Sequence, residues 1–279
     1  MNSLSTIRTT TRVLGTIAPR LTAGLARKLM MTPRVHQPRE WERGALESAE
    51  RITFRFGLSG LRWGNGGPVV LMMHGWQGRP TQFKQFIAPL LAAGRQVIAL
   101  EAPGHGRSPG PESNVYLFAQ ALLDAAAELR GVESVVGHSM GGSAALIAMG
   151  EHRYAERAVV IGSPGSLVRV LDRFADSIAL PEAAKRSFFD LVDERVGVPA
   201  SELDTSRIGP HLHMPGLVVH DRDDDMVPFA EGEAIARAWP QARFLATEGL
   251  GHRQVLADPG VVHAVASFLT DGEALQRAA

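Results

Sequence analysis

The chain has 279 residues, and its 29 basic and 29 acidic side chains give a formal net charge of zero, so nothing points to nucleic acid or another acidic polymer as a partner. It contains no cysteine, which excludes a disulfide framework, a thiolate metal site and a cysteine nucleophile. No apolar run approaches the roughly 20 residues that a membrane-spanning helix needs. We therefore expect a soluble, cytoplasmic protein whose apolar fraction of 45% builds a large core.

The N-terminal segment, residues 1–47, differs in composition from the rest of the chain. Up to Arg39 it has seven Lys or Arg residues and no acidic residue. Its apolar side chains follow helical spacing at Val13, Ile17, Leu21 and Leu25. Pro19 and Arg20 interrupt the apolar run that a secretory signal would need. A basic amphipathic helix can make weak contact with an anionic membrane surface, but we prefer a helix that packs on the domain or lies in solvent.

From residue 48 onward, patterns typical of strands and helices alternate. The expected strands are 51–56, 60–63, 68–73, 96–100, 132–136, 158–161, 216–220 and 243–246. The expected helices between them are 81–93, 114–130, 143–149 and 229–238. This alternation predicts an α/β fold over residues 48–279, with a mostly parallel central sheet and helices on both faces.

A G-x-S-x-G pentapeptide centred on Ser139 joins the strand 132–136 to the helix 143–149. A strand that turns sharply into a helix at such a motif is the context of a nucleophile elbow. Side chains at Gly137 or Gly141 would collide with neighbouring elements in so tight a turn. The Ser139 hydroxyl would then stand at a helix N-terminus, where developing negative charge is stabilised.

Residues 74–78 follow the apolar strand 68–73 directly and would end at the same edge of the sheet as the elbow. An acyl-transfer site needs two backbone N–H groups directed at the oxyanion, one from the residue after the nucleophile and one from a loop in this position. Met140 and Trp76 are the residues that fit these two roles.

The regular alternation stops at residues 163–213, which precede the strand 216–220. Helical spacing relates Leu167, Leu171, Phe174 and Ile178. A second helix begins at Pro181 and ends at Gly197. A long insertion beside an active site is often a lid, so we expect a small helical cap inserted before the acid-bearing strand. The alternative is a pair of core helices that do not contact substrate.

The acidic run after the strand 216–220 offers the carboxylate of a triad. A calcium loop starting at Asp221 is excluded, because Met226 stands where the loop needs glycine and Gly232 where it needs glutamate. A triad on this topology runs Ser, Asp, His along the chain, and His252 follows the last strand. One helix and one strand separate the acidic run from His252. The acidic run and His252 would therefore follow adjacent strands and meet at one edge of the sheet.

Together these motifs resemble the α/β-hydrolase fold serine hydrolases, of esterase or lipase type, over roughly residues 48–270. The matching segments are His74–Trp76 (oxyanion loop), residues 103–108 (the turn after strand 96–100), residues 137–142 (elbow), Asp224 (acid) and Gly251 with His252 (base). The resemblance implies the α/β-hydrolase fold and a Ser139–Asp224–His252 triad.

Two departures from the family pattern affect this assignment. The acid commonly lies three residues after a glycine and four before a proline; Pro228 selects Asp224, but Asp221 replaces the glycine, which leaves Asp223 as a second choice. Glu101 stands where many relatives have aspartate, and we interpret it as structural.

The expected activity is hydrolysis of small to medium carboxylic esters (EC class 3.1.1), with His252 as general base for Ser139 and Asp224 orienting the imidazole. The same triad also serves amide, thioester and C–C bond hydrolysis and acyl transfer. The serine excludes the aspartate-nucleophile chemistry of epoxide hydrolases and dehalogenases. An ordered triad argues against a purely binding protein. No cofactor is expected, and the oligomeric state stays open.

The remaining candidate residues have less specific roles. We expect the substrate pocket to be lined by the loop residues His74 and Gln77 and by the cap residues Phe174, Phe188 and Phe189. His138 should pack beneath the site. Structural or surface roles are assigned to His211, His213, His220 and His263. Their spacing does not suit zinc, so no metal is expected.

Overall fold

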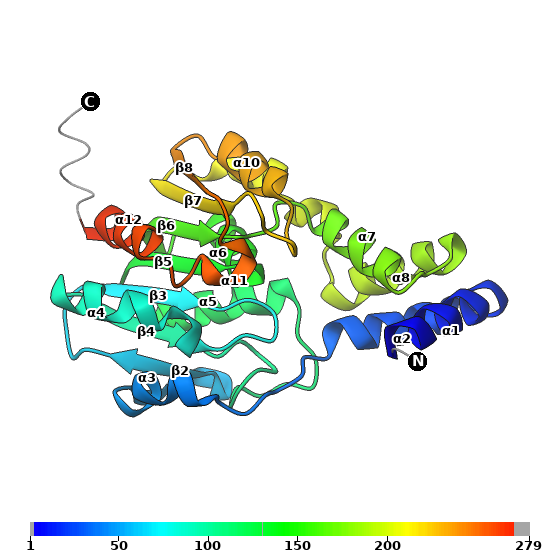
Figure 1. Cartoon of the computed structure of the whole chain (residues 1–279), viewed down its shortest axis with the longest axis horizontal. Coiled ribbons are helices and arrows are strands. Elements are labelled where there is room, and N and C mark those ends of the chain that lie inside the picture. Colours follow the sequence, from blue (N-terminus) through cyan, green and yellow to red (C-terminus); the bar gives the residue numbers. More distant parts are fainter. Residues whose placement is uncertain (1–2, 130, 271–279) are drawn as a thin grey trace. The chain divides into compact units, whose positions relative to one another are not determined.

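The computed structural model describes residues 3–129 and 131–270 (Figure 1). Parts of three predictions lie outside the described residues: the start of the N-terminal segment, the last residue of the helix 114–130 and the end of the domain. The described chain divides into two compact units. The helical unit comprises residues 3–33 and 166–204, and the sheet unit comprises the other described residues, 34–165 and 205–270.

The sheet unit is built on one sheet of eight strands in the order β1-β2-β4-β3-β5-β6-β7-β8. The strands are β1 (Glu50–Thr53), β2 (Ser59–Trp63), β3 (Val69–Met73), β4 (Gln96–Leu100), β5 (Val132–His138), β6 (Ala155–Ile161), β7 (Gly216–Asp221) and β8 (Ala242–Thr247). β2 is antiparallel to both β1 and β4, and all other pairs are parallel. The predicted α/β fold with a mostly parallel sheet is confirmed.

Helices cover both faces of this sheet (Figure 1). They are α3 (Arg43–Glu47), α4 (Lys84–Ala92), α5 (Val115–Leu129), α6 (Met140–Glu151), α9 (Thr205–Ile208), α10 (Phe229–Ala238), α11 (Gly251–Gln254) and α12 (Pro259–Thr270). α4 and α12 share one core with alternate residues of the strands, and α5 packs against α6. Short 3-10 helices lie at Glu40–Glu42, Arg55–Gly57, Pro80–Phe83, Ala200–Leu203 (helical unit) and Gly209–His211.

The central strands are buried on both faces, which explains their continuous apolar sequences. In β3, Val70 and Met72 belong to the core shared with α4 and α12. Leu71 and Met73 are equally buried, and successive side chains of a strand point to opposite faces of the sheet. Because β3, β5, β6 and β7 are parallel, their carboxyl ends lie at one edge of the sheet. The loops that follow β3, β5 and β7 at this edge carry the polar residues discussed below.

The helical unit combines the N-terminal helices with the inserted helices. It contains α1 (Ser3–Ile17), α2 (Pro19–Met31), α7 (Leu167–Ser177) and α8 (Glu182–Val196), and α2 packs chiefly on α8. The N-terminal helices approach through small side chains: a Cβ added at Gly15 would lie 2.6 Å from Pro181 Cδ. Arg8 Nη1 donates to the carbonyl of Ser177 at 2.9 Å. Lys185 ties α8 to α7 through ion pairs of 2.7 Å with Asp172 and 3.0 Å with Asp176.

This arrangement differs from the predicted boundaries of 1–47 and 163–213. The compact helical unit takes only residues 3–33 from the N-terminal segment and 166–204 from the insertion. Residues 34–47 belong to the sheet unit, because Glu42 and Trp41 are held there by Arg79 and Lys84. None of the helices within the described ranges combines the length and the apolar character that a bilayer span requires.

Candidate active site

Ser139 lies at the turn between β5 and α6, in a backbone conformation that is rare for a residue with a side chain. Its φ of 53° and ψ of −126° fall outside the helical and extended regions. The strain is maintained by the flanking hydrogen bonds, since Ser139 N–H donates to the carbonyl of Ile161 at 2.9 Å and its own carbonyl accepts from Gly142. The half-buried side chain lies in the wall of a cavity, at the N-terminus of a twelve-residue helix.

The glycines of the motif are required by close approaches of the backbone. A Cβ at Gly137 would lie 2.4 Å from the carbonyl oxygen of Gly141. One at Gly141 would lie 2.2 Å from the carbonyl oxygen of Met73, and one at Gly75 would lie 2.8 Å from Ser139 Cβ. The turn therefore packs directly on the end of β3, as the sequence motif predicts.

The predicted acid and base, Asp224 and His252, form a buried hydrogen-bonded pair. His252 Nδ1 lies 2.7 Å from Asp224 Oδ2. Nδ1–H donates to the carboxylate, so Nε2 is left as the basic nitrogen. Asp224 Oδ1 accepts from the backbone N–H groups of Met226 (2.9 Å) and Val227 (2.7 Å). Burial acts to raise the pKa of Asp224, but the hydrogen bonds from His252 and the backbone outweigh it and keep the pKa below its usual value.

The other two aspartates considered at the sequence level make different contacts. Asp223 is exposed, and its Oδ2 accepts from Gly249 N–H at 2.8 Å. Asp221 Oδ1 accepts from the N–H groups of Asp223, Leu250 and Gly251, and Oδ2 from the Thr247 hydroxyl. Asp221 thus joins the loop after β7 to the loop that carries His252. It fixes the position of both loops without reaching the imidazole.

The loop after β3 presents the Trp76 N–H beside the serine. Within the described part of the chain, no protein group accepts a hydrogen bond from this N–H. The Met140 N–H opens helix α6 and is one of the N–H groups that an α-helix leaves without an internal partner. The next residue of the loop, Gln77, has a positive φ of 55°, and its N–H donates to His105 Nε2 at 3.1 Å. The two N–H groups expected to bind an oxyanion are therefore both available.

Two buried histidines support this loop as neutral rings. His74 Nδ1–H donates to the carbonyl of Gly75 (2.7 Å), and Nε2 accepts from the Ala102 N–H (3.1 Å). Burial, with the nearby His105, lowers the pKa of His74 to about 3, so the ring is neutral at ordinary pH. His105 binds similarly between Gln77 N–H and the carbonyl of Pro103, and burial lowers its pKa also. The segment 103–108 thus holds the oxyanion loop in place.

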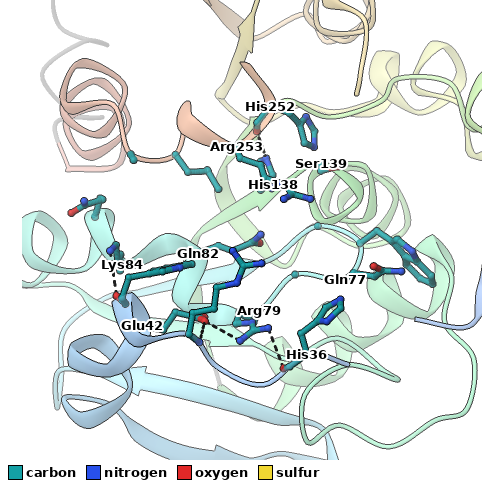
Figure 2. A pocket seen from close by; sticks show the side chains of 18 of the residues that line it. His36, Glu42, Gln77, Arg79, Gln82, Lys84, His138, Ser139, His252 and Arg253 are labelled. Atoms are coloured by element: carbon teal, nitrogen blue, oxygen red, sulfur yellow. Dashed lines mark hydrogen bonds and ion pairs between the residues drawn. The ribbon is translucent and has the colours of Figure 1, made fainter. Parts of the chain in front are cut away.

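His138, which precedes the serine, contacts the candidate base. Its Nε2 donates to the carbonyl of His252 at 2.9 Å, and the two rings lie 4.8 Å apart (Figure 2). Burial lowers the pKa of His138 to about 3, so a neutral ring lies beneath His252. His220 is also buried near the acid, with Nε2 2.9 Å from the carbonyl of Val227 and 3.5 Å from Asp224 Oδ2.

A cavity of about 440 Å³ opens beside Ser139 and His252, entirely within the sheet unit (Figure 2). Most of the residues that line it are polar or charged, although apolar atoms form the larger part of the wall surface, and they include the cationic residues Arg39, Arg79, Lys84 and Arg253. The carboxylate in the lining, Glu42, is buried and pairs with Arg79 at 2.9 Å. Among the described residues, no carboxylate forms an ion pair with the side chain of Arg39, Lys84 or Arg253. The cavity wall therefore has an excess of positive charge.

The five predicted pocket residues are placed differently from one another. Gln77 lines the cavity. His74 is fully buried behind the loop and does not line it, because both ring nitrogens are engaged by the backbone. Phe174, Phe188 and Phe189 belong to the helical unit, where the Phe188 ring centroid lies 5.6 Å from that of Phe174 and 5.9 Å from that of Phe189. Phe188 is fully buried there.

The sequence did not predict that three residues of the N-terminal part, His36, Arg39 and Trp41, line the cavity. They precede the first strand and carry no catalytic motif. We expected His138 to pack beneath the site, but the sequence did not predict its hydrogen bond to the carbonyl of His252. The spacing of Glu42 to Arg79 gives no signal of a contact between side chains 37 residues apart in the chain.

An eight-stranded, mostly parallel sheet with a serine at a strand-to-helix turn defines the α/β-hydrolase class. The profile of the Alpha/beta hydrolase family matches residues 69–265, and the chain belongs to that family. The family resemblance drawn from the motifs is confirmed.

Relatives and solved structures agree with this membership. Esterase Rv0045c from Mycobacterium tuberculosis is 34% identical over 132 residues, which is 45% of this chain and 43% of that esterase, so the match spans less than half of its length. A pimeloyl-[acyl-carrier protein] methyl ester esterase from Aromatoleum aromaticum is 26% identical over 69% of this chain and 94% of its own length. The structure of a putative lipase from Acinetobacter baumannii superposes with a TM-score of 0.65 at 18% identity, covering 84% of this chain and 95% of the lipase, which shows the shared fold.

Proposed function

We propose that this protein is a serine ester hydrolase that cleaves carboxylic esters through an acyl-enzyme. The observation that carries the proposal is the 2.7 Å hydrogen bond between His252 Nδ1 and Asp224 Oδ2 beside a serine in the strained conformation of an elbow. This hydrogen bond leaves His252 Nε2 as the proton acceptor that a serine hydroxyl needs. Two proteins of similar sequence bear the name esterase, which supports this reaction class.

In the proposed mechanism, Ser139 Oγ attacks the ester carbonyl while His252 Nε2 removes its proton. The Trp76 and Met140 N–H groups stabilise the oxyanion, each contributing on the order of 3 kcal/mol. The tetrahedral intermediate then collapses, and the protonated His252 gives its proton to the departing alcohol. A water molecule, deprotonated by His252, hydrolyses the acyl-enzyme and releases the acid. Amide, thioester or C–C bond cleavage would use the same groups on another substrate.

The positive charge of the cavity wall supports a preference for esters that carry a negative charge. Arg39, Lys84 and Arg253 lack carboxylate partners, so a negatively charged group on the substrate would gain favourable electrostatic energy beside the serine. Exposed cations of this kind contribute up to about 1 kcal/mol each, which is about fivefold in rate or affinity. We therefore propose esters that carry an anionic group, such as a carboxylate at the far end of the acyl chain.

The function is tested with p-nitrophenyl butyrate and with the mono-p-nitrophenyl ester of succinic acid, which differ chiefly in a terminal carboxylate. We expect the protein to hydrolyse both esters and to show the higher kcat/KM with the charged one. Arg39→Gln and Arg253→Gln should each lower the ratio of the two kcat/KM values by about fivefold, and 0.5 M salt should lower it also. Arg237→Gln, an exposed substitution on α10 outside the cavity, is the control. No hydrolysis of either ester by the wild type would refute ester hydrolysis; hydrolysis with an unchanged ratio in all variants would refute only the charge preference.

We also propose that the inserted helices influence acyl-chain selectivity as a cap, and the three phenylalanines test this. Phe188 is fully buried in the helical unit, so Phe188→Ala should cost about 3–5 kcal/mol of stability. Phe174 and Phe189 are half-buried. Phe174→Ala or Phe189→Ala should shift the preferred acyl length by about two carbons, a change of roughly tenfold in kcat/KM ratios. Thermal unfolding and an ester series from C2 to C10 separate the effects. An unchanged ester profile in both half-buried variants would exclude the cap from selectivity.

A further inference from the structure

The N-terminal helices expose a continuous stripe of large apolar side chains. We call this the apolar stripe; its members are Val13, Leu14, Ile17, Leu21, Leu25 and Leu29. Ile17 is 75% exposed and Leu21 is 69% exposed, and even the least exposed member, Leu14, reaches 42%. Within α1 the spacing of Val13, Leu14 and Ile17 puts them on one side of the helix, and within α2 the four-residue spacing of Leu21, Leu25 and Leu29 does the same. Single exposed apolar residues are common, but a contiguous stripe marks an interaction site.

In these helices the exposed and buried sides are the reverse of those in an amphipathic helix of a globular protein. In such helices the large apolar side chains face the neighbours and small or polar ones face water. In α2 the buried residues are Thr22, Ala23, Ala26 and Met31. In α1, Gly15 lies against Pro181 at the start of α8. Apart from Met31 at the end of α2, these buried residues are small, and Leu21, Leu25 and Leu29 remain exposed.

Charge is distributed unevenly over the same unit. Residues 1–33 contain five basic residues, Arg8, Arg12, Arg20, Arg27 and Lys28, and no acidic residue. The inserted segment 166–204 contains eight acidic and five basic residues. The net charge is thus positive on the helices that carry the apolar stripe and negative on the inserted segment. This combination of exposed leucines with flanking Lys and Arg suits a surface that is negatively charged outside and apolar inside.

We propose that α1 and α2 bind flat on an anionic lipid bilayer, with the apolar stripe inserted among the acyl chains at the interface. Arg12, Arg20 and Lys28 then lie at the level of the lipid phosphates. The small-residue side of α2 stays on α8, so binding requires no unfolding of the helical unit. The attachment is peripheral and reversible, because one amphipathic surface supplies far less apolar burial than a spanning helix.

A second copy of the chain is the other occupant that an apolar stripe admits. Two copies joined through this stripe would bring together two sets of five basic residues without an acidic residue on α1 or α2 to pair with them. These like charges would repel each other across the contact, whereas anionic lipid headgroups would neutralise them. The charge pattern therefore favours the bilayer.

The experiment is co-sedimentation of the full-length protein with sucrose-loaded vesicles of phosphatidylcholine, alone or with 30% phosphatidylglycerol. We expect binding to the mixed vesicles and at least tenfold weaker binding to phosphatidylcholine alone. Replacing Ile17, Leu21 and Leu25 together by Ser should lower the partition coefficient by roughly 100-fold, since three large side chains no longer insert. Replacing Arg12, Arg20 and Lys28 together by Gln should remove the preference for the anionic vesicles.

The matched control is Phe56→Ser, which removes an apolar side chain that is 79% exposed in the sheet unit. This variant should bind vesicles like the wild type. All variants are checked by circular dichroism and by hydrolysis of a water-soluble ester, which should not change because none of these residues lies in the active site. The readout is binding, so it stands whether or not ester hydrolysis is the activity. Equal binding of the wild type and the Ser variant, or a wild-type dimer in light scattering that the Ser variant dissociates while vesicles are not bound, would overturn the proposal.

Discussion

Ser139→Ala should lower kcat for ester hydrolysis by about 10⁶-fold, the loss seen when a serine triad is deprived of its nucleophile. The reason is that no acyl-enzyme can form without the hydroxyl. The half-buried serine makes its structural hydrogen bonds through the backbone, and alanine keeps these bonds. The thermal midpoint should therefore stay close to that of the wild type. Burst kinetics with a p-nitrophenyl ester measure the activity, and a fluorophosphonate probe should label the wild type at this residue.

The control for this prediction is Ser143→Ala on the same helix. Ser143 donates its hydroxyl to the carbonyl of Pro164 at 2.7 Å, so its loss should cost some stability while labelling persists. Labelling that survives Ser139→Ala would place the nucleophile elsewhere.

Asp224→Asn should lower kcat by about 10⁴-fold, because an amide nitrogen at the Oδ2 position cannot accept the proton of His252 Nδ1. The imidazole would turn to the tautomer with its proton on Nε2, which is the nitrogen that must remove the serine proton. The volume of the side chain is unchanged and Oδ1 still accepts from Met226 and Val227, so the loop should keep its shape. Steady-state kinetics across pH 5 to 9 measure the effect.

Asp223→Asn is the matched comparison, because Asp223 is the neighbouring carboxylate and the alternative acid at the sequence level. It contacts the Gly249 N–H through Oδ2, and its loss should lower kcat by less than tenfold. If Asp223→Asn proves the more damaging of the two, the assignment of the acid is displaced by one residue.

The sheet could be predicted from the sequence because its strands are encoded locally. Apolar runs such as 68–73 and 96–100 lie within a residue of β3 and β4. The first strand was predicted too long: β1 ends at Thr53, and the chain then forms a 3-10 turn in which Phe56 has a φ of 58° and is 79% exposed. The alternating pattern of residues 51–56 does not distinguish the strand from the turn that follows it.

The candidate triad was also accessible to sequence reasoning, because each member follows a strand at a position that motif spacing specifies. The lining of the cavity was not. Arg39 and Glu42 reach the site through a segment without regular sequence pattern, and although Arg253 follows the base in the sequence, no motif indicates that it lines the cavity. Such contacts depend on the three-dimensional path of the chain, which a local pattern does not encode.

The N-terminal helices show a different limit of sequence reasoning. Their periodicity predicts an amphipathic helix correctly, but periodicity alone does not tell which side is buried. In α2 the buried side is the one with Ala23 and Ala26, because small side chains allow close contact with α8. An analysis based on hydrophobicity alone would have buried Leu21 and Leu25 instead.

The helical unit is assembled from two segments that leave the ribosome far apart in time. About 170 residues separate the end of α2 from the end of the inserted segment. At a synthesis rate of about 5–20 residues per second, α1 and α2 wait on the order of ten to thirty seconds before α8 is complete. During this interval both sides of the helices are uncovered, and their sequence is basic and leucine-rich. The order of synthesis thus allows these helices to meet other cellular surfaces before they meet their own partner in the fold.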